Sequence, residues 1–151
     1  MARILKQILV IDTEKDVAVG IKLPFNNPTK GLFDLSYSTE EQAISNLKNL
    51  LLTSKGERLY LPNFGTGIID LLFNPNTPEI VESLSDEIST AISFWMPYII
   101  INNIDVQNKI NSLGNNAEHG ISISINFNVT NRGANQTIVL DINQNGAITV
   151  Q

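Results

Sequence analysis

Apolar side chains recur every three or four residues along two stretches of the chain, which predicts two amphipathic helices. The first stretch covers residues 38–53 and the second covers residues 77–95. The apolar positions are Ala43, Ile44, Leu47, Leu50 and Leu51 in the first stretch, and Ile80, Val81, Leu84, Ile88, Ala91, Ile92 and Trp95 in the second. We expect each set to form one buried stripe.

Residues at the starts of these two stretches suit helix N-termini. Ser38 and Glu41 have the spacing of a capping box, in which the serine hydroxyl accepts from the Glu41 amide and the glutamate side chain reaches back. Thr77 precedes Pro78, a residue that is favoured at the first helical position because its missing N–H is not needed there. Pro97 is expected to close the second helix.

After Pro97 the apolar period falls to two, which predicts strands in residues 98–110, 119–130 and 136–146, separated by turns rich in Gly and Asn. In the middle segment Ile, Phe and Val at odd positions 121–129 alternate with Ser and Asn at even positions, so one face is dry and the other wet. An alternative for the end of the chain is that "NQNG" turns residues 147–150 back onto the sheet.

These elements predict an α+β fold in which two main helices pack on a C-terminal antiparallel β meander. We interpret residues 1–151 as a single domain. It has an extended N-terminal segment in residues 1–37, a helical part in residues 38–97 and the meander in residues 98–151. A chain of this length can bury about two-thirds of its unfolded surface, which suits one core.

Composition excludes several functions. A net charge of −5 and a pI near 4.7 argue against nucleic acid as a partner, because binding phosphates requires a basic surface. The sequence has no Cys, and therefore no disulfide framework or thiolate nucleophile. No apolar run approaches the roughly 20 residues of a membrane span, so we expect no membrane association.

Candidate chemistry is sparse. The Ser54-Lys55-Gly56 run lacks the spaced glycines of a phosphate-binding loop, and His119 stands in "NNAEHG", which we expect to be a hairpin turn. Glu57 and Asp70 are the only carboxylate pair near an unusual loop, and spacing alone leaves a glycosidase open. We predict no catalytic residue, no metal site, no cofactor and no small-molecule substrate.

Several short motifs between residues 38 and 110 resemble those of one protein family. They are Leu52-Thr53, Gly56-Glu57-Arg58, Phe64-Gly65, Leu72-Phe73, Asn76-Thr77-Pro78 and Met96-Pro97-Tyr98, followed by the strands. In this order they resemble the baseplate wedge family of contractile phage tails, also called GPW or lysozyme-like, which is related to the type VI secretion baseplate subunit.

The resemblance implies a structural protein and not an enzyme, with the lysozyme label as an inherited name. It implies a sheath initiator of the virion tail baseplate that is assembled in the host cytoplasm. Its implied partners are other wedge and core-bundle proteins and the tail sheath protein.

The segment "TSKGERLYLPNFG" is the first expected partner-binding site. Gly56 and Pro62 would fix the loop, Glu57 and Phe64 flank its centre, and Arg58 would present a planar guanidinium to a carboxylate or to carbonyls. The alternative is an intramolecular salt bridge of Arg58 with Glu57 or a helix C-terminus.

The second expected site is the strand Ile138, Val139, Leu140, Asp141 and Ile142. It has one charge and no Pro, which suits the addition of a partner's strand along a free edge. The alternative is an ordinary final strand pair.

Overall fold

The computed structural model describes residues 17–23, 33–68, 78–110, 116–129, 135–142 and 148–150. The chain divides into two compact units, Met1–Asn49 and Leu50–Gln151. Helix α2, Thr39–Leu52, spans the boundary between them.

The first unit joins a short strand pair to the start of helix α2. Strand β1, Gly20–Ile21, pairs antiparallel with β2, Leu35–Ser36. The Ser36 hydroxyl donates to Gln42 Oε1 at 2.5 Å, and the Leu23 amide donates to Ser45 Oγ at 3.2 Å. These bonds tie the described residues beside β1 and β2 to one side of the helix.

The predicted cap of α2 is present, with one change. The Glu41 amide donates to Ser38 Oγ at 3.2 Å, as expected. The Glu41 side chain reaches back to the amide of Tyr37, at 3.2 Å, and also accepts from Lys22 Nζ at 2.9 Å. Burial raises the pKa of Glu41, but the Lys22 hydrogen bond, the Tyr37 amide and the Lys22 charge outweigh it and leave the pKa below its ordinary value.

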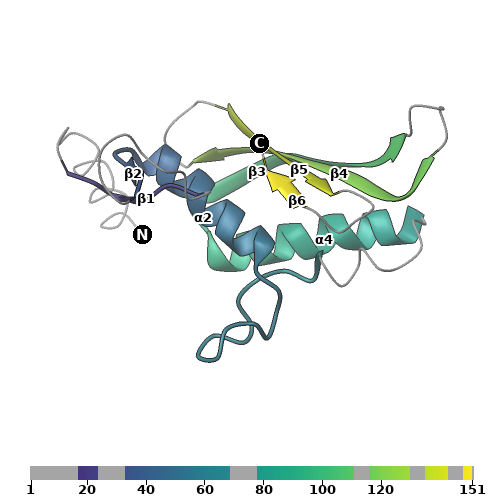
Figure 1. Cartoon of the computed structure of the whole chain (residues 1–151), viewed down its shortest axis with the longest axis horizontal. Coiled ribbons are helices and arrows are strands. Elements are labelled where there is room, and N and C mark those ends of the chain that lie inside the picture. Colours follow the sequence, from purple (N-terminus) through teal and green to yellow (C-terminus); the bar gives the residue numbers. More distant parts are fainter. Residues whose placement is uncertain are drawn as a thin grey trace. The chain divides into compact units, whose positions relative to one another are not determined.

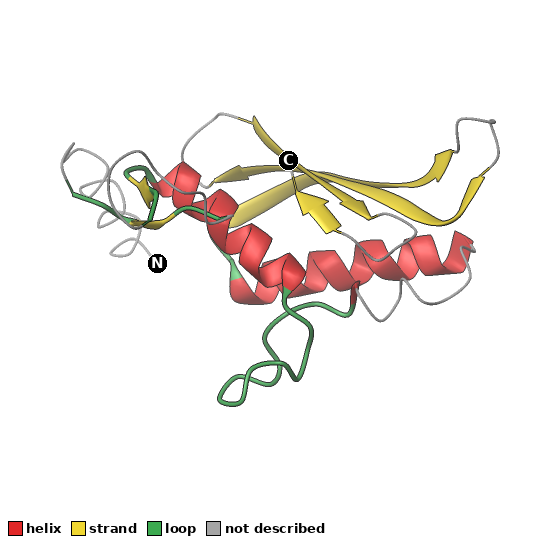
Figure 2. Ribbon diagram, viewed as in Figure 1, coloured by secondary structure: helices red, strands yellow, loops and turns green. Residues whose placement is uncertain are grey.

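The second unit is a four-stranded antiparallel sheet with helix α4, Pro78–Trp95, along one face (Figures 1 and 2). The strands are β3, Ile99–Ile110; β4, Asn116–Val129; β5, Asn135–Ile142; and β6, Ile148–Val150. Their order in the sheet is β3-β4-β5-β6, so each strand pairs with its neighbour in sequence. The α+β class is therefore confirmed.

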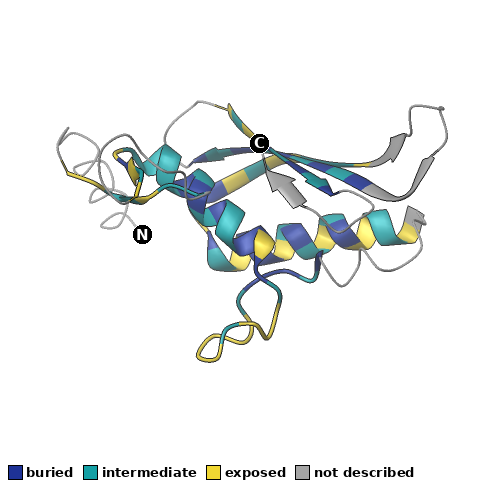
Figure 3. Ribbon diagram, viewed as in Figure 1, coloured by how far each residue is buried: buried dark blue, intermediate teal, exposed yellow. Residues whose placement is uncertain are grey.

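The core of this unit follows the predicted stripes (Figure 3). On α4 the buried positions are Leu84, Ile88, Ala91 and Ile92, and on β4 they are Ile121, Ile123, Ile125, Phe127 and Val129. Ile80, Val81 and Trp95 belong to the predicted stripe but are only partly buried. The polar residues at positions 122, 124, 126 and 128 are less buried than their neighbours, as the alternation predicts.

Two details of the meander differ from the sequence-based expectation. A fourth strand, β6, pairs with the end of β5 in the register Leu140↔Val150 and Ile142↔Ile148, which is the alternative of a chain that turns back onto the sheet. The expected turn around His119 is wrong, because β4 begins at Asn116 and includes it. Pairing of Ile110 with Asn116 extends the hairpin, so tertiary pairing outweighs the polar composition of this segment.

Candidate docking site

The segment that follows α2 forms a closed loop, residues 53–66, which belongs entirely to the second unit. A parallel bridge joins Ser54 to Thr66, and the Thr66 amide donates to the Thr53 carbonyl at 2.9 Å. The buried Thr66 hydroxyl donates to the Leu51 carbonyl at 3.0 Å, which satisfies one acceptor at the C-terminus of α2. The base of the 53–66 loop is thus fixed by hydrogen bonds.

Further hydrogen bonds hold the interior of the loop. The Gly56 amide donates to the Pro62 carbonyl at 2.7 Å, which links the two residues expected to fix the loop. The Ser54 amide donates to Glu57 Oε2 at 3.0 Å, and the Glu57 amide donates to the Ser54 carbonyl at 3.2 Å. The Glu57 carboxylate therefore shapes the turn.

Gly56 and Gly65 both have positive φ, at 87° and 112°. A Cβ on Gly65 would lie 2.2 Å from the Thr53 carbonyl oxygen, whereas a Cβ on Gly56 would meet nothing within 4 Å. Gly65 is therefore needed both for its backbone conformation and for the close approach that forms the bridge to Thr53.

Arg58 lies over an aromatic ring of its own loop. Its guanidinium carbon is 3.9 Å from the centre of the Phe64 ring, a cation–π contact. Phe64 contacts Trp95 edge to face with centroids 5.2 Å apart, and Trp95 contacts Phe94 in the same way at 5.0 Å. Arg58 is therefore oriented by a row of aromatic rings that extends to the end of α4.

An ion pair ties the loop to the middle of α4. Glu87 Oε1 accepts from Lys55 Nζ and also from the Gly67 amide at 3.2 Å, so one carboxylate contacts both ends of the loop. The Lys55 hydrogen bond lowers the pKa of Glu87, burial opposes this, and the Gly67 amide and the Lys55 charge add to the lowering. The net pKa is below the ordinary value.

The loop tip consists of apolar residues exposed to solvent (Figure 3). Leu59 is 95% exposed, Tyr60 96% and Leu61 48%. These residues lie inside the segment predicted to dock, but the predicted contact in that segment is Arg58 and not the apolar tip. Their signal is a run of three apolar residues in a segment with neither helical nor strand periodicity, so no secondary-structure face could bury them.

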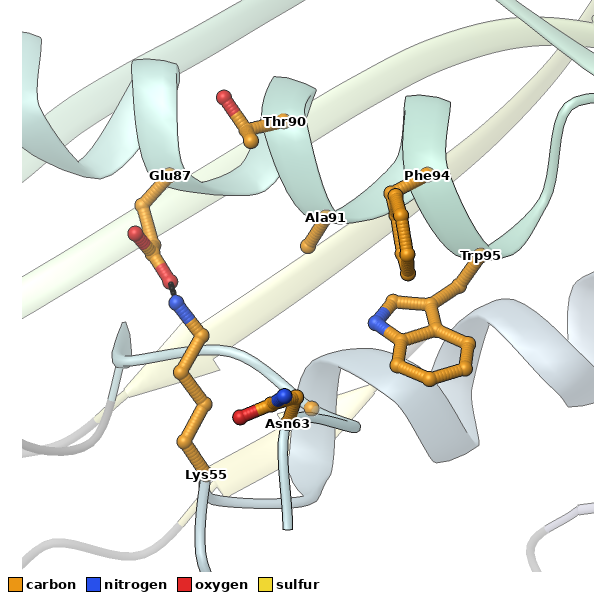
Figure 4. A pocket seen from close by; sticks show the side chains of 8 residues that line it. Lys55, Asn63, Glu87, Thr90, Ala91, Phe94 and Trp95 are labelled. Atoms are coloured by element: carbon orange, nitrogen blue, oxygen red, sulfur yellow. Dashed lines mark hydrogen bonds and ion pairs between the residues drawn. The ribbon is translucent and has the colours of Figure 1, made fainter. Parts of the chain in front are cut away.

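A pocket of about 260 Å³ lies between the loop and α4 (Figure 4). It is lined by Lys55, Asn63, Gly65, Glu87, Thr90, Ala91, Phe94 and Trp95. Lys55, Asn63 and Gly65 lie in the segment predicted to dock, but the α4 residues were not predicted as part of a site, because only the fold brings the two segments together.

The model of one protein family, described as the baseplate wedge protein gp25, matches residues 38–134. The chain belongs to this family. Its members are structural baseplate proteins, and the match includes α2, the 53–66 loop, α4 and the first two strands of the sheet. A search of curated protein sequences finds no match.

The fold is shared with two solved structures, and a third is more distantly similar. A protein described as a tail lysozyme from Geobacter sulfurreducens has a TM-score of 0.58 at 24% identity, with 68% of this chain and 87% of that chain covered. A chain of the anti-feeding prophage baseplate has a TM-score of 0.62 at 18% identity, covering 75% of this chain and 86% of that chain. A chain of the type VI secretion baseplate complex has a TM-score of 0.47 at 16% identity, covering 68% of this chain and 93% of that chain.

The second expected site of this family member, on β5, is arranged differently from the loop. Ile138, Leu140 and Ile142 point into the core, each 1% exposed, and Val139 and Asp141 alternate with them. Asp141 accepts from the Ser122 hydroxyl at 2.8 Å across the strands. We expected one edge of the whole segment 138–142 to be unpaired. This expectation is wrong at Leu140–Ile142, because β6 pairs there.

Other candidate chemistry receives little support. Among the described residues no three of His, Cys, Asp and Glu group as metal ligands would. Asp70, the partner proposed for Glu57 in a glycosidase, lies outside the described residues, as do Leu72 and Phe73 of the family motifs and the Thr77 cap. None of the helices in the described parts of the chain has the length and hydropathy to span a membrane.

Proposed function

We propose that this chain is a structural subunit of a contractile tail baseplate that docks on the core bundle through its 53–66 loop. The observation that carries the proposal is the construction of the loop. Its base and interior are held by hydrogen bonds, while Leu59 and Tyr60 at its tip are almost fully exposed. A fixed loop loses little conformational entropy when it binds, so its exposed apolar side chains can contribute their full burial to affinity.

Arg58 supplies the polar part of the proposed contact. Stacking on Phe64 restrains the guanidinium, and a restrained planar donor suits carboxylates and backbone carbonyls of a protein partner. Gly56, Glu57, Pro62 and Phe64 act in this account as supports for the loop, through the contacts that each of them makes inside it. The surface presented to the partner is Arg58 with the apolar tip.

A crosslinking experiment tests this docking. A photoreactive phenylalanine analogue replaces Tyr60 in one sample and the exposed α4 residue Glu82 in a matched control, and tails are assembled with each. Illumination should join position 60, but not position 82, to another baseplate protein. Equal crosslinking at the two positions, or none at position 60 in assembled tails, would contradict docking through the loop.

We further propose that the sheet of this subunit nucleates the tail sheath by strand addition. Since β6 covers Leu140–Ile142, an incoming strand would pair beside residues 135–139 of β5 or beyond β6. Both positions continue the antiparallel sheet, and main-chain pairing of this kind needs few specific side chains. The subunit would thereby reside in the virion tail after assembly in the host cytoplasm.

Pro and Ala substitutions at Gln136, Thr137, Ile138 and Val139 test strand addition. Pro removes a backbone donor, so positions that bond to β4 should lose stability, while positions that face outward should keep the fold. Among the well-folded Pro variants, those at outward positions should prevent sheath growth in electron micrographs, and the matching Ala variants should not. Normal sheaths on every folded Pro variant would rule this contact out.

A glycosidase is the alternative function. Of the two carboxylates considered for this activity, only Glu57 is among the described residues. Its carboxylate accepts from the Ser54 amide and so already has a structural role. A peptidoglycan turbidity assay with the wild-type protein and Glu57→Gln should show no clearing in either. Clearing by the wild-type protein that is lost in Glu57→Gln would establish the enzyme.

A further inference from the structure

The pocket beside the 53–66 loop has one apolar and one polar end. Figure 4 shows Phe94 and Trp95 on one side, the Ala91 methyl group pointing toward the middle, and the Lys55–Glu87 pair on the opposite side. Phe94 is 72% exposed although it is a large apolar residue. Aromatic residues are enriched in protein interfaces, where polar groups form the rim.

The indole of Trp95 provides a directed hydrogen-bond donor to this pocket. Its nitrogen edge is turned toward the pocket interior (Figure 4), and within the described parts of the chain the indole N–H has no acceptor. An indole nitrogen can only donate, and tryptophans usually satisfy this group when they are buried, as the Trp95 indole would be in a filled pocket. An occupant with an acceptor, such as a carbonyl oxygen, would do so.

The charged groups of the pocket favour a neutral occupant. Lys55 and Glu87 pair with each other, and the same Glu87 oxygen accepts from the Gly67 amide. Because the two charges cancel locally, neither an anion nor a cation gains a strong unpaired counter-charge there. A main-chain carbonyl is the acceptor that fits this balance.

The volume limits the size of the occupant. Small-molecule sites usually have volumes of about 300 to 1,000 Å³, and this pocket, at about 260 Å³, is smaller. It can hold one large side chain. The walls that would contact that side chain, Phe94 and Ala91, are apolar.

We propose that this pocket binds one apolar side chain from an extended segment of another baseplate protein. The side chain lies against Phe94 and Ala91, and a main-chain carbonyl of the segment accepts from the Trp95 indole. This inference rests on the proposed role of the chain as a docking subunit. In this proposal the loop tip of this chain contacts the partner, and a side chain of the partner enters the pocket of this chain.

Trp95 is the single tryptophan of the sequence, which gives the pocket its own reporter. The probe is the blocked tripeptide acetyl-alanyl-leucyl-alanine amide, added to ¹⁵N-labelled protein while the indole N–H signal is followed by NMR. We expect a saturable shift of that signal at millimolar peptide. The glycine-centred tripeptide, which lacks the apolar side chain, should shift it much less.

Two variants separate the pocket from general apolar binding. Phe94→Ser removes an exposed wall of the pocket, and Ile100→Ser removes an apolar side chain that is 53% exposed on β3 and does not line it. Phe94→Ser should weaken tripeptide binding about tenfold, since one good apolar contact contributes on that order, and Ile100→Ser should not change it. Absence of a saturable indole shift, or equal weakening by both variants, would overturn the inference.

Co-purification with the other tail proteins distinguishes this inference from the proposed function. If the wild-type protein retains its partners and Phe94→Ser loses them while Ile100→Ser does not, the pocket inference is supported. If all three retain them equally, the pocket inference fails and the docking function stands. If the indole signal instead moves with protein concentration in the absence of peptide, the occupant is a second copy of this chain and the proposal is wrong.

Discussion

Two regions of the second unit are built by different means. One is the core between α4 and the sheet, and the other is the 53–66 loop. The core is held by apolar side chains that are almost completely buried, such as Leu84 and Ile123. The loop is held by backbone hydrogen bonds, two glycines with positive φ and one ion pair to α4, while its tip leaves Leu59 and Tyr60 in solvent.

This difference separates stability from function. Apolar burial gives the largest share of folding free energy, and it does not depend on direction. Directed hydrogen bonds add less to stability but fix where groups point. The family fold therefore provides a stable frame, and in the function we propose the loop uses that frame to present a surface to partners.

The core should show the largest loss on substitution. Leu84 is fully buried on α4, so Leu84→Ala should lower the free energy of unfolding by about 2 to 5 kcal/mol through lost burial and the cavity left behind. Urea unfolding measures this. The control Glu82→Ala, at an exposed position on the same helix, should change it by less than about 0.5 kcal/mol. Similar values for the two would mean that this face of α4 is not core.

The loop base should depend on Gly65 more than on Gly56. Ala at either position must adopt positive φ, which costs about 1 to 2 kcal/mol. Only Gly65→Ala also brings a Cβ within 2.2 Å of the Thr53 carbonyl oxygen, so its loss of stability should be the larger of the two. Thermal unfolding of the two variants provides the comparison, and equal losses would show that the Ser54–Thr66 bridge is not required.

The Thr66 hydroxyl should contribute to the free energy of unfolding by about as much as one hydrogen bond. Thr66→Val keeps the shape but removes the donor to the Leu51 carbonyl, and the expected loss is about 1 kcal/mol. Thr90→Val, at an exposed position of α4, is the matched control and should be close to neutral. If urea unfolding gave the same small change for both, the hydroxyl would not anchor the loop.

The ion pair of Glu87 should give the smallest effect, and one that depends on pH. The pKa of Glu87 is lowered in the folded protein, so its stabilising contribution is present above the unfolded pKa and is lost as pH falls through the folded pKa. Glu87→Gln should therefore cost less than about 1 kcal/mol at pH 7, and progressively less as pH falls from the unfolded pKa through the lower folded pKa. A difference that persisted unchanged in acid would contradict the assigned role of the carboxylate.

The parts of the molecule that sequence could predict are those governed by periodicity. The α4 stripe and the alternation of β4 follow directly from residue spacing, and the Ser38 cap follows from a local motif. The contact of Glu87 with both loop ends depends on how distant segments meet, and the stacking of Arg58 on Phe64 depends on the irregular backbone of the loop between them. No spacing rule encodes such contacts, whereas the pairing of β6 with β5 is one of the two alternatives that the "NQNG" turn leaves open.

The most direct test of the central claim, that the loop serves docking and not folding, is to compare stability and binding in Arg58→Ala. Cation–π contacts contribute about 0.5 kcal/mol when exposed and about 2 kcal/mol when desolvated, so for half-buried Arg58 the thermal midpoint should fall by no more than about 8 °C. Co-purification with the other tail proteins should be lost, and Arg58→Lys, which keeps the charge without the planar fork, should bind poorly as well. A large fall in the midpoint, or unchanged binding by a stable Arg58→Ala protein, would contradict the account.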